Sequence, residues 1–552
     1  MLLPTVVGRT GRQRQTLFQN GHEIKLTTMR KYLFTALASC ALLCAPVNAP
    51  AQDNGPKPLF TEPITKQPKG RMVKNQVRKA LSFYTDVGGA NVDSVDYYIG
   101  NYVIGDDDCV YLKNPFTFFP TQSYLKLECL NGDTLVAHMP QAIFINTEEI
   151  PYYASRMVLK AGSQGMTYGF EQNADGTYNT DMRFLFRGDT LTLIGEDNVE
   201  GDYPKVILGL TTLAGIWNEA GEVELSVRPT DKKPLSLPQG VKPQLYQLSH
   251  TGFYGDATDL VEVAFADNKV YVSNPYSTTA LQWAEGEIKG NSVVFARQYL
   301  GPNESDGYHI FFVPGVYSET APDFFDLADT LRFNYDNATK SLTATDLQSI
   351  LINVGDRRVF TAAAYINPSL SPYTATAGKP ANPEITSFGR YGEEAEGEGY
   401  LQFEFPSEDV YAQPLFKNNL YYKVYTAEGK ALTFSPEKYS GLDTEITEVP
   451  YGLNDNTDFF MADDSHKFYF FQAADSLGLQ TVYKGEQELS SDIVWTTGRT
   501  TTSISQPAIS QTAAEVRYYD LQGRRLSQPR RGVCIRQRVM TNGSVANDKT
   551  IK

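Results

Sequence analysis

Histidine is the residue that most often serves as a base or a zinc ligand near neutral pH. The 552-residue chain holds five histidines, and four of them lie beyond residue 52: His138, His250, His309 and His466. None of the four stands in an HExxH or HxH arrangement, and the sequence contains neither a Gly-x-Ser-x-Gly nucleophile elbow nor a phosphate-binding glycine loop. The four histidines are therefore predicted to be sheet-surface or turn residues. No residue is predicted to be catalytic, and the chain is not expected to be an enzyme.

Carboxylates are numerous enough to leave two other chemistries open. Asp106-Asp107-Asp108, Glu393-Glu394 and Asp463-Asp464 form clusters that are most simply interpreted as solvated turns. A pair of such loop carboxylates could hydrolyse glycans, and one cluster could hold calcium. The stretch Glu171–Gly176 begins like a calcium-binding loop, but Met182 stands where that loop needs a bidentate glutamate. A glycine-containing hairpin turn is the favoured interpretation there, so no cofactor is predicted and calcium alone is left open.

Aromatic residues suggest a binding surface. The chain has 34 Tyr, 30 Phe and three Trp, and the apolar face of a sugar packs well against a flat aromatic ring. Tyr271, Tyr276 and Trp283 could line a platform for a glycan, with neighbouring asparagines as hydrogen-bond partners. The alternative is that these three side chains fill the core, as aromatic residues in strands usually do, and this alternative is favoured.

The N-terminus carries an export signal. Met29-Arg30-Lys31 precedes the apolar run Tyr32–Ala45, and Ala49-Pro50-Ala51 precedes Gln52. A cationic start, a short apolar run and a small-x-small site are typical of a secretory signal peptide. We therefore expect a signal peptide at 29–51 with cleavage between Ala51 and Gln52, and an upstream mis-start at 1–28. The mature protein is expected to be secreted or attached to the outer membrane or cell surface.

A competing interpretation of the same region is a lipoprotein, because Leu37-Ala38-Ser39-Cys40 matches a lipid-attachment box. Cleavage before Gln52 would instead leave Cys109, Cys129 and Cys534, which form no disulfide framework and no CxxC pair. Cys109 and Cys129 could pair across neighbouring strands, but two unpaired, half-buried thiols are favoured.

The charge and hydropathy of the chain exclude two kinds of partner. The net charge is −15, and an acidic body repels phosphate backbones, so nucleic acid is not a predicted partner. Apolar runs long enough to cross a bilayer as a helix are not found, so no transmembrane segment is predicted.

An internal repeat organises the first two thirds of the chain. Val110–Phe116 (VYLKNPF) recurs as Val270–Tyr276 (VYVSNPY), and each copy is followed by a strand that begins with an aromatic residue, Tyr124 or Trp283. Short alternating strands joined by Gly/Asn/Asp turns predict antiparallel sandwich or barrel units. We place these β-repeat units at 70–235 and 240–374, with the proline-containing stretch Lys233–Pro243 as a linker.

A third β-domain is predicted at 380–497, where Tyr400–Phe405 and Leu420–Tyr425 alternate cleanly between apolar and polar residues. This region resembles a fibronectin type III or related immunoglobulin-like sandwich. Two positions depart from that family, since Phe405 stands where a strand-B tryptophan is common and Lys467 where a corner tyrosine is expected. The predicted fold class is therefore all-β, with tandem antiparallel sandwich or barrel units followed by a fibronectin type III/Ig-like sandwich.

A polar linker at 498–514 leads to a C-terminal segment at 515–552. Its stretches Tyr519–Arg524 (YDLQGR) and Gly532–Ile535 resemble the sorting tails of exported Bacteroidetes proteins that use type IX secretion. The second repeat, with Val270–Val272 and Gly290–Phe295, also resembles a unit common in uncharacterised exported proteins of that phylum. The resemblance brings no assigned activity.

These observations predict a secreted or surface-attached, non-enzymatic interaction protein that binds a glycan or a host or matrix protein. The alternative is a secreted glycan-acting hydrolase that uses loop carboxylates. Nothing in the sequence indicates an oligomeric state.

Overall fold

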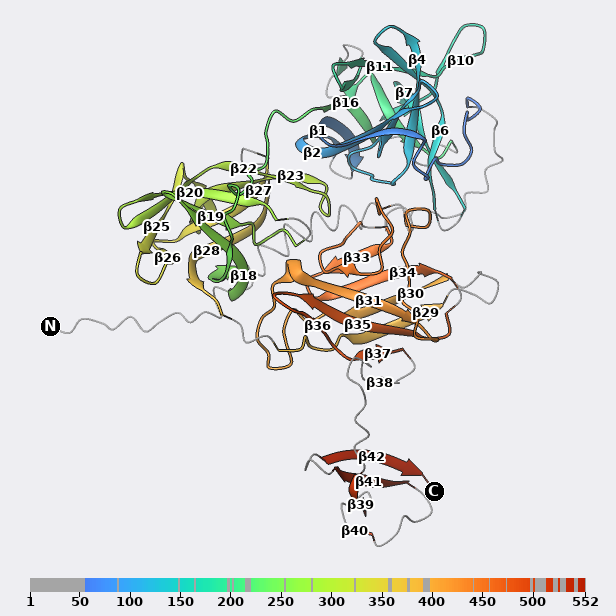
Figure 1. Ribbon diagram of the computed structural model, residues 1–552. Coiled ribbons are helices and arrows are strands. Elements are labelled where there is room, and N and C mark those ends of the chain that lie inside the picture. The colour runs from blue at the N-terminus through green and yellow to red at the C-terminus, as the bar shows by residue number, and fades with distance from the viewer. Residues whose placement is uncertain are drawn as a thin grey trace, which may run out of the picture.

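The computed structural model is built almost entirely of antiparallel strands (Figure 1). It describes residues 55–551 except for 87–88, 147–148, 163–164, 196–198, 201–202, 214–219, 253–254, 279–280, 322–323, 356–359, 375–377, 391–397, 440, 456, 473, 497–499, 502–512, 520–524, 527–532 and 541–544. The helical element within the described residues is one short 3-10 turn at Lys417–Asn419. None of the described helical structure has the length and apolarity to cross a membrane. The predicted all-β fold class is confirmed.

The first unit is a closed barrel of eight antiparallel strands. Its strands, in the order of pairing, are β1 (Gly70–Asp86), β2 (Gly89–Gly105), β3 (Val110–Lys113), β4 (Tyr124–Asn131), β5 (Thr134–His138), β11 (Asp181–Arg187), β12 (Thr190–Leu193) and β16 (Ala220–Arg228), which returns to β1. Alternate side chains point inward, and Tyr102, Leu112, Leu125, Phe184 and Val227 fill the interior. Closure pairs the backbone of every barrel strand, so the barrel has no open edge.

A side sheet extends this barrel from β16. It consists of β15 (Val206–Thr211), β7 (Pro151–Gly162), β6 (Gln141–Ile145) and β8 (Gly165–Gly169). Two short hairpins complete the unit, β9 (Glu171–Gln172) with β10 (Tyr178–Asn179), and β13 (Val199–Glu200) with β14 (Tyr203–Pro204). The first hairpin is the glycine-containing turn predicted at Glu171–Gly176: Gly176 has φ +86°, and the Asp175 carboxylate accepts the Thr177 N–H at 2.9 Å.

The second unit has the same circular order of pairing as the first. Its barrel strands are β17 (Gln244–Gly252), β18 (Gly255–Ala266), β19 (Lys269–Ser273), β20 (Trp283–Lys289), β21 (Ser292–Ala296), β25 (Thr330–Asp336), β26 (Ser341–Ala344) and β28 (Phe360–Pro372), which returns to β17. Its side sheet runs from β28 through β27 (Gln348–Val354) to β23 (Tyr308–Tyr317), which pairs with β22 (Gln298–Asn303) and β24 (Phe325–Leu327). Each strand of the second barrel thus has a counterpart in the first.

The third domain is a two-sheet sandwich. One sheet has the order β29 (Glu384–Arg390), β30 (Glu398–Glu404), β34 (Ser465–Phe471), β33 (Phe459–Ala462). The other has the order β32 (Val449–Pro450), β31 (Leu420–Thr426), β35 (Leu477–Lys484), β37 (Ile493–Trp495), β38 (Thr500–Thr501), with β36 (Glu488–Ser490) beside β35. Aromatic side chains from both sheets, Phe403, Phe405, Tyr422 and Phe468 among them, form the core of the sandwich.

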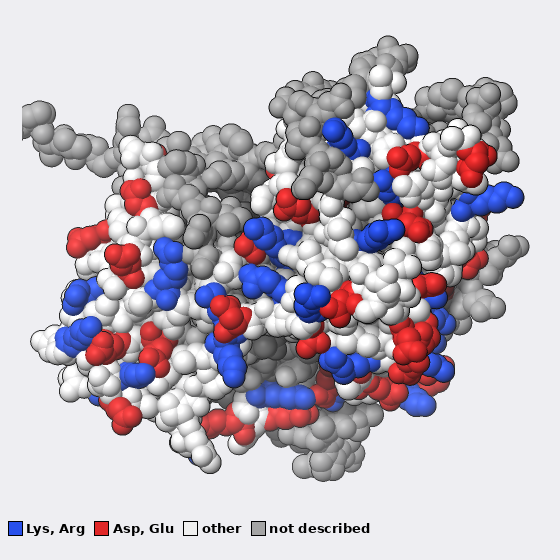
Figure 2. Space-filling model, turned by 90° about the horizontal axis from the view of Figure 1, so that it is seen from above, with Lys and Arg blue, Asp and Glu red and all other residues white. Residues whose placement is uncertain are grey.

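The C-terminal segment contributes a separate small sheet, with the order β40 (Arg525–Leu526), β39 (Ala513–Tyr519), β41 (Val533–Met540), β42 (Val545–Ile551). The predicted cleavage site between Ala51 and Gln52 and most of the 498–514 linker lie outside the described residues. Seen from above, the described surface carries basic and acidic side chains interspersed with one another (Figure 2).

Candidate functional site

The predicted aromatic platform is not a surface. Tyr271 and Trp283 are only 4% and 6% exposed, and with Ala264 they form a small cluster on the outer wall of the second barrel. Leu235, Leu237 and Val241 of the preceding linker pack over this cluster, which is why neither ring can meet a ligand. Tyr276 lies apart from them: it packs against the barrel core and donates its hydroxyl to the carboxylate of Asp306. The favoured interpretation, in which these side chains are buried, therefore holds for Tyr271 and Trp283, and the less favoured glycan platform of Tyr271, Tyr276 and Trp283 does not form.

The first barrel covers its outer wall in the same way. Tyr111 and Tyr124, the counterparts of Tyr271 and Trp283 in the repeat, cluster with Val103 and Cys109. Ile64, which precedes the first barrel strand, packs on this cluster, and its carbonyl accepts the Tyr124 N–H at 2.9 Å. In both barrels the repeated aromatic pair is an anchor for the segment that precedes the barrel.

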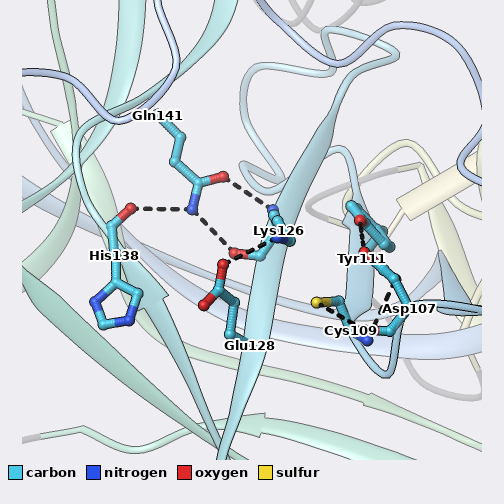
Figure 3. A network of polar contacts seen from close by, with 7 residues as sticks. All are labelled: Asp107, Cys109, Tyr111, Lys126, Glu128, His138 and Gln141. Carbon is cyan, nitrogen blue, oxygen red and sulfur yellow. Dashed lines mark hydrogen bonds and ion pairs between the residues drawn. The ribbon is translucent and has the colours of Figure 1, made fainter.

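Polar contacts beside this cluster tie neighbouring strands together (Figure 3). The Gln141 side chain accepts the Lys126 N–H at 3.0 Å and donates to the carbonyls of Lys126 and His138 at 2.9 and 3.1 Å. Lys126 also forms an ion pair of 2.9 Å with Glu128. These bonds hold β4, β5 and β6 in register, which is a structural role.

The acidic cluster Asp106–Asp108 also has structural partners. The Asp107 carboxylate accepts the Tyr111 hydroxyl at 2.7 Å and the Cys109 N–H at 3.4 Å, and the Tyr111 hydrogen bond lowers the pKa of Asp107. Asp464, in the turn between β33 and β34, accepts the Tyr451 hydroxyl. Glu393 and Glu394 lie outside the described residues. Groups of three or more potential metal ligands are not found in the described part of the chain.

The two cysteines of the first barrel are free thiols, Cys109 buried and Cys129 exposed. Tyr111 pairs with Lys126 and Val110 with Leu127, so Cys109 lies on the outer face of the wall together with Tyr111. Cys129 has the strand parity of Leu125 and Leu127, whose side chains point into the barrel. The two sulfurs therefore belong to opposite faces and do not pair.

Two of the four histidines are deeply buried, contrary to the predicted surface or turn positions. His309 and His466 are 0% and 2% exposed, and burial lowers the pKa of both imidazoles. Neutral rings are tolerated there because their nitrogens have partners: His309 contacts the Tyr299 hydroxyl at 2.7 Å and the Gln76 carbonyl at 3.1 Å, and His466 contacts the Tyr451 carbonyl at 2.8 Å. His138 and His250 pair with Asp181 and Asp259, each at 2.8 Å.

A different cluster of aromatic side chains does face outward. On the outer face of the sheet β29-β30-β34-β33, three partly exposed aromatic side chains, Tyr400, Phe460 and Tyr469, surround Lys467. We call these four residues the aromatic–lysine patch. Strand alternation places them there, because Leu401, Phe403 and Phe468 point the opposite way into the sandwich core. The pairing of Tyr400 with Tyr469 and of Phe460 with Lys467 brings them together from three strands.

The geometry of the patch is centred on the Lys467 ammonium. Its Nζ lies 4.4 Å from the centre of the Tyr469 ring, 4.8 Å from that of Tyr400 and 5.8 Å from that of Phe460. It also donates a hydrogen bond of 2.7 Å to the Tyr469 hydroxyl. Ring faces attract a cation, so the rings hold the ammonium without neutralising its charge.

The sequence contained the signal for this patch. Tyr400-Leu401-Gln402-Phe403 and Lys467-Phe468-Tyr469 alternate, so each strand shows which of its side chains share a face. The pairing of β30 with β34 across the intervening strands was not visible in the sequence. Exposed aromatic rings and an ammonium that share one sheet face can contact a ring-shaped ligand and hydrogen-bond to its rim.

The three bodies also meet at a polar junction. Asn75 of the first barrel donates to Glu304 of the second at 2.7 Å, and Lys74 forms an ion pair with Asp443 of the sandwich. Ser305 of the second barrel donates to the Gly452 carbonyl of the sandwich at 3.3 Å. Lys113 lies among these charges, and burial together with Lys74 lowers its pKa.

No protein-family model and no curated protein matches this sequence.

Proposed function

We propose that the protein is a non-enzymatic interaction protein, secreted or held at the cell surface, which binds a glycan or a protein ligand through the outer face of its sandwich. The observation that supports this most is the aromatic–lysine patch, where three rings and an ammonium share one solvent-facing surface. Aromatic and cationic side chains are common at the centre of recognition surfaces, since they offer large contact area and directional contacts.

The location part of the proposal rests on the sequence. The export signal at 29–51 and the resemblance of the tail to type IX sorting segments both favour a protein outside the inner membrane. The resemblance to fibronectin type III domains and the duplication of the barrel unit favour an extracellular architecture of tandem β-modules. Such modules commonly carry their binding residues on exposed faces and loops.

The test is a binding screen of the mature chain, residues 52–552, on glycan and host-protein arrays. The wild-type protein is compared with a Lys467→Met/Tyr400→Ala double variant, whose fold is verified by circular dichroism. We expect at least one array ligand to be bound by the wild type and lost by the double variant. Arrays that are blank for the wild type, or binding that the double variant retains in full, would contradict the proposal.

A further inference from the structure

A short strand contact joins the two barrels, and we call it the barrel joint. Tyr98 of β2 pairs with Tyr308 of β23, and the Ile99 N–H donates to the Gly307 carbonyl at 2.8 Å. The two tyrosine rings meet edge to face, with their centres 4.6 Å apart. His309 is the next residue along β23 and is 0% exposed. The joint therefore buries an ionisable side chain between two bodies that each have a core of their own.

The hydrogen bonds of His309 fit its neutral form. Its Nε2 lies 3.1 Å from the Gln76 carbonyl of the first barrel, and its Nδ1 lies 2.7 Å from the Tyr299 hydroxyl of the second. A carbonyl only accepts, so Nε2 carries the ring proton and Nδ1 accepts the hydroxyl proton of Tyr299. A second proton on Nδ1 would take the place of that bond. The closed joint thus selects the uncharged imidazole.

The surroundings of the ring also disfavour the imidazolium. Burial lowers the pKa of His309, and the like charge of the Arg228 guanidinium, on β16 of the first barrel, lowers it further against the opposing effect of the Gln76 carbonyl. Of the described groups at the joint, Arg228 alone carries a charge that acts on the ring. The other titratable groups beside it are the phenols of Tyr98, Tyr299 and Tyr308.

The sign of the pH dependence follows from these contacts. In separated barrels the ring meets water and regains its ordinary pKa of about 6.5, whereas in the closed joint its pKa is lower. Below about pH 6.5 the open form therefore takes up a proton that the closed form excludes, and the closing equilibrium constant falls with the pH. It stays constant above that range, and it levels off below the pKa of the closed form.

Two buried carboxyls near this pH range act in the opposite direction. Asp306 of the β22–β23 hairpin accepts the Tyr276 hydroxyl, and burial raises its pKa. Asp458 of the sandwich also has a raised pKa. Acid favours the buried form of both carboxyls, so neither can open the joint as the pH falls.

We propose that the barrel joint is an acid-sensitive switch, in which proton uptake by His309 parts the two barrels. The spacing of the barrels then depends on the acidity of the surroundings. This inference goes beyond the proposed function, because it concerns the shape of the protein and not its ligand.

The experiment measures hydrogen exchange of the mature chain by mass spectrometry, resolved to single amides by electron-transfer fragmentation. The Ile99 N–H reports the joint, and the Leu159 N–H, which donates to the Lys205 carbonyl at 2.8 Å, reports the fold of the first barrel unit. After correction for the intrinsic pH dependence of exchange, the protection of Ile99 should fall about tenfold between about pH 7.5 and 5.5. The protection of Leu159 should stay within about twofold.

Two variants and a control assign the effect to His309. His309→Gln keeps a donor for the Gln76 carbonyl but takes up no proton, so its Ile99 protection should be the same at both pH values. Arg228→Glu leaves the histidine in place and should make the fall smaller, because a carboxylate stabilises the imidazolium. His138→Gln removes the half-exposed histidine that pairs with Asp181 and should keep the full fall.

Three results would overturn the inference. The first is equal Ile99 protection of the wild type at both pH values. The second is a fall that Leu159 shares, which would mean that the barrel itself unfolds. The third is a fall of wild-type size in His309→Gln or, if that variant does not fold, in Arg228→Glu.

Discussion

At the scale of single residues, Asp458 of the sandwich keeps its proton up to an unusually high pH because of its burial and its neighbour Asp455. Asp455 accepts the N–H groups of Thr457, Asp458 and Phe459 at 2.8–2.9 Å, which fixes the turn before β33. Asp458 is 7% exposed, and burial together with the Asp455 charge raises its pKa to about 7. Its proton is therefore linked to the stability of the sandwich near neutral pH.

The direction of this linkage follows from the two pKa values. Below about pH 4 the Asp458 carboxyl is protonated in both the folded and the unfolded chain. Between about pH 4 and 7 the unfolded chain releases the proton while the folded chain keeps it, so the free energy of unfolding decreases as the pH rises. Above about pH 7, the pKa of Asp458 in the folded chain, this carboxyl is ionised in both states and the free energy of unfolding no longer changes through it.

Replacing Asp458 with asparagine should remove this dependence. At pH 8 we expect Asp458→Asn to be more stable than the wild type by about 1–2 kcal/mol, after allowance for solvent screening, and at about pH 3.5 to be nearly equal to it. Thermal unfolding followed by circular dichroism at both pH values measures the difference. Parallel stability curves for the two proteins would show that Asp458 ionises normally in the fold.

At the scale of strands, a β-bulge decides which side chains enter the first barrel. Leu81 pairs with Glu224 and Ser82 with Glu222, so Val223 is the extra residue in β16. The bulge turns Glu222 inward, where it is fully buried, while Glu224 stays exposed. Glu222 accepts the Ser82 hydroxyl at 2.6 Å and the Thr117 N–H, and the nearby Arg78 is buried as well.

Glu222→Ala should therefore be strongly destabilising. It leaves the Arg78 charge and the Thr117 N–H buried with fewer partners, and the loss of one member of such a group costs about 3–5 kcal/mol. Glu224→Ala, on the same strand beyond the bulge, is the matched control and should cost less than about 0.5 kcal/mol. Urea denaturation of the two variants would separate them, and similar midpoints would contradict the assigned role of Glu222.

The same scale shows what could and could not be predicted from the sequence. Alternation in Val270-Tyr271-Val272 correctly predicts strands with two distinct faces, and the all-β fold follows from many such segments. It cannot show that linker leucines cover Tyr271, because that contact joins residues far apart in the chain. Nor does it reveal the inward turn of Glu222, since a bulge breaks the period of two on which the prediction depends. Local patterns encode the faces, and non-local pairing decides which of them stay exposed.

At the scale of the whole molecule, both polar and apolar contacts join the two barrels and the sandwich. Leu245 and Leu260 of the second barrel pack against the sandwich core, and Tyr97 of the first barrel packs against the apolar cluster around Phe311. Besides the bonds at Lys74, Asn75 and Ser305, Tyr98 of the first barrel packs against Tyr308 of the second with ring centres 4.6 Å apart. The ion pair between Lys74 and Asp443 is the part of this interface that responds to charge and salt.

Reversing one charge at this junction should loosen it. Lys74→Glu places a second carboxylate opposite that of Asp443. Because exposed ion pairs contribute at most about 1 kcal/mol, we expect partial opening of the junction rather than unfolding. Small-angle X-ray scattering at low salt should show a radius of gyration larger by about 1–2 Å. The double reversal Lys74→Glu/Asp443→Lys should return it to the wild-type value; an unchanged radius in the single variant would argue against a closed junction.

The segments that precede the two barrels determine where the chain can be cut into fragments that each keep a complete barrel unit. Lys233–Pro243 has the composition of a linker, yet its leucines cover Trp283. A fragment that begins at residue 240 would therefore expose this tryptophan on the outer wall of the barrel. A fragment that begins before Lys233 would keep Tyr271 and Trp283 covered. The same reasoning moves the start of the first barrel from Gly70 back to Phe60, whose backbone pairs with Gln141. For each barrel, the preceding stretch covers part of the outer wall and so belongs to the folded unit.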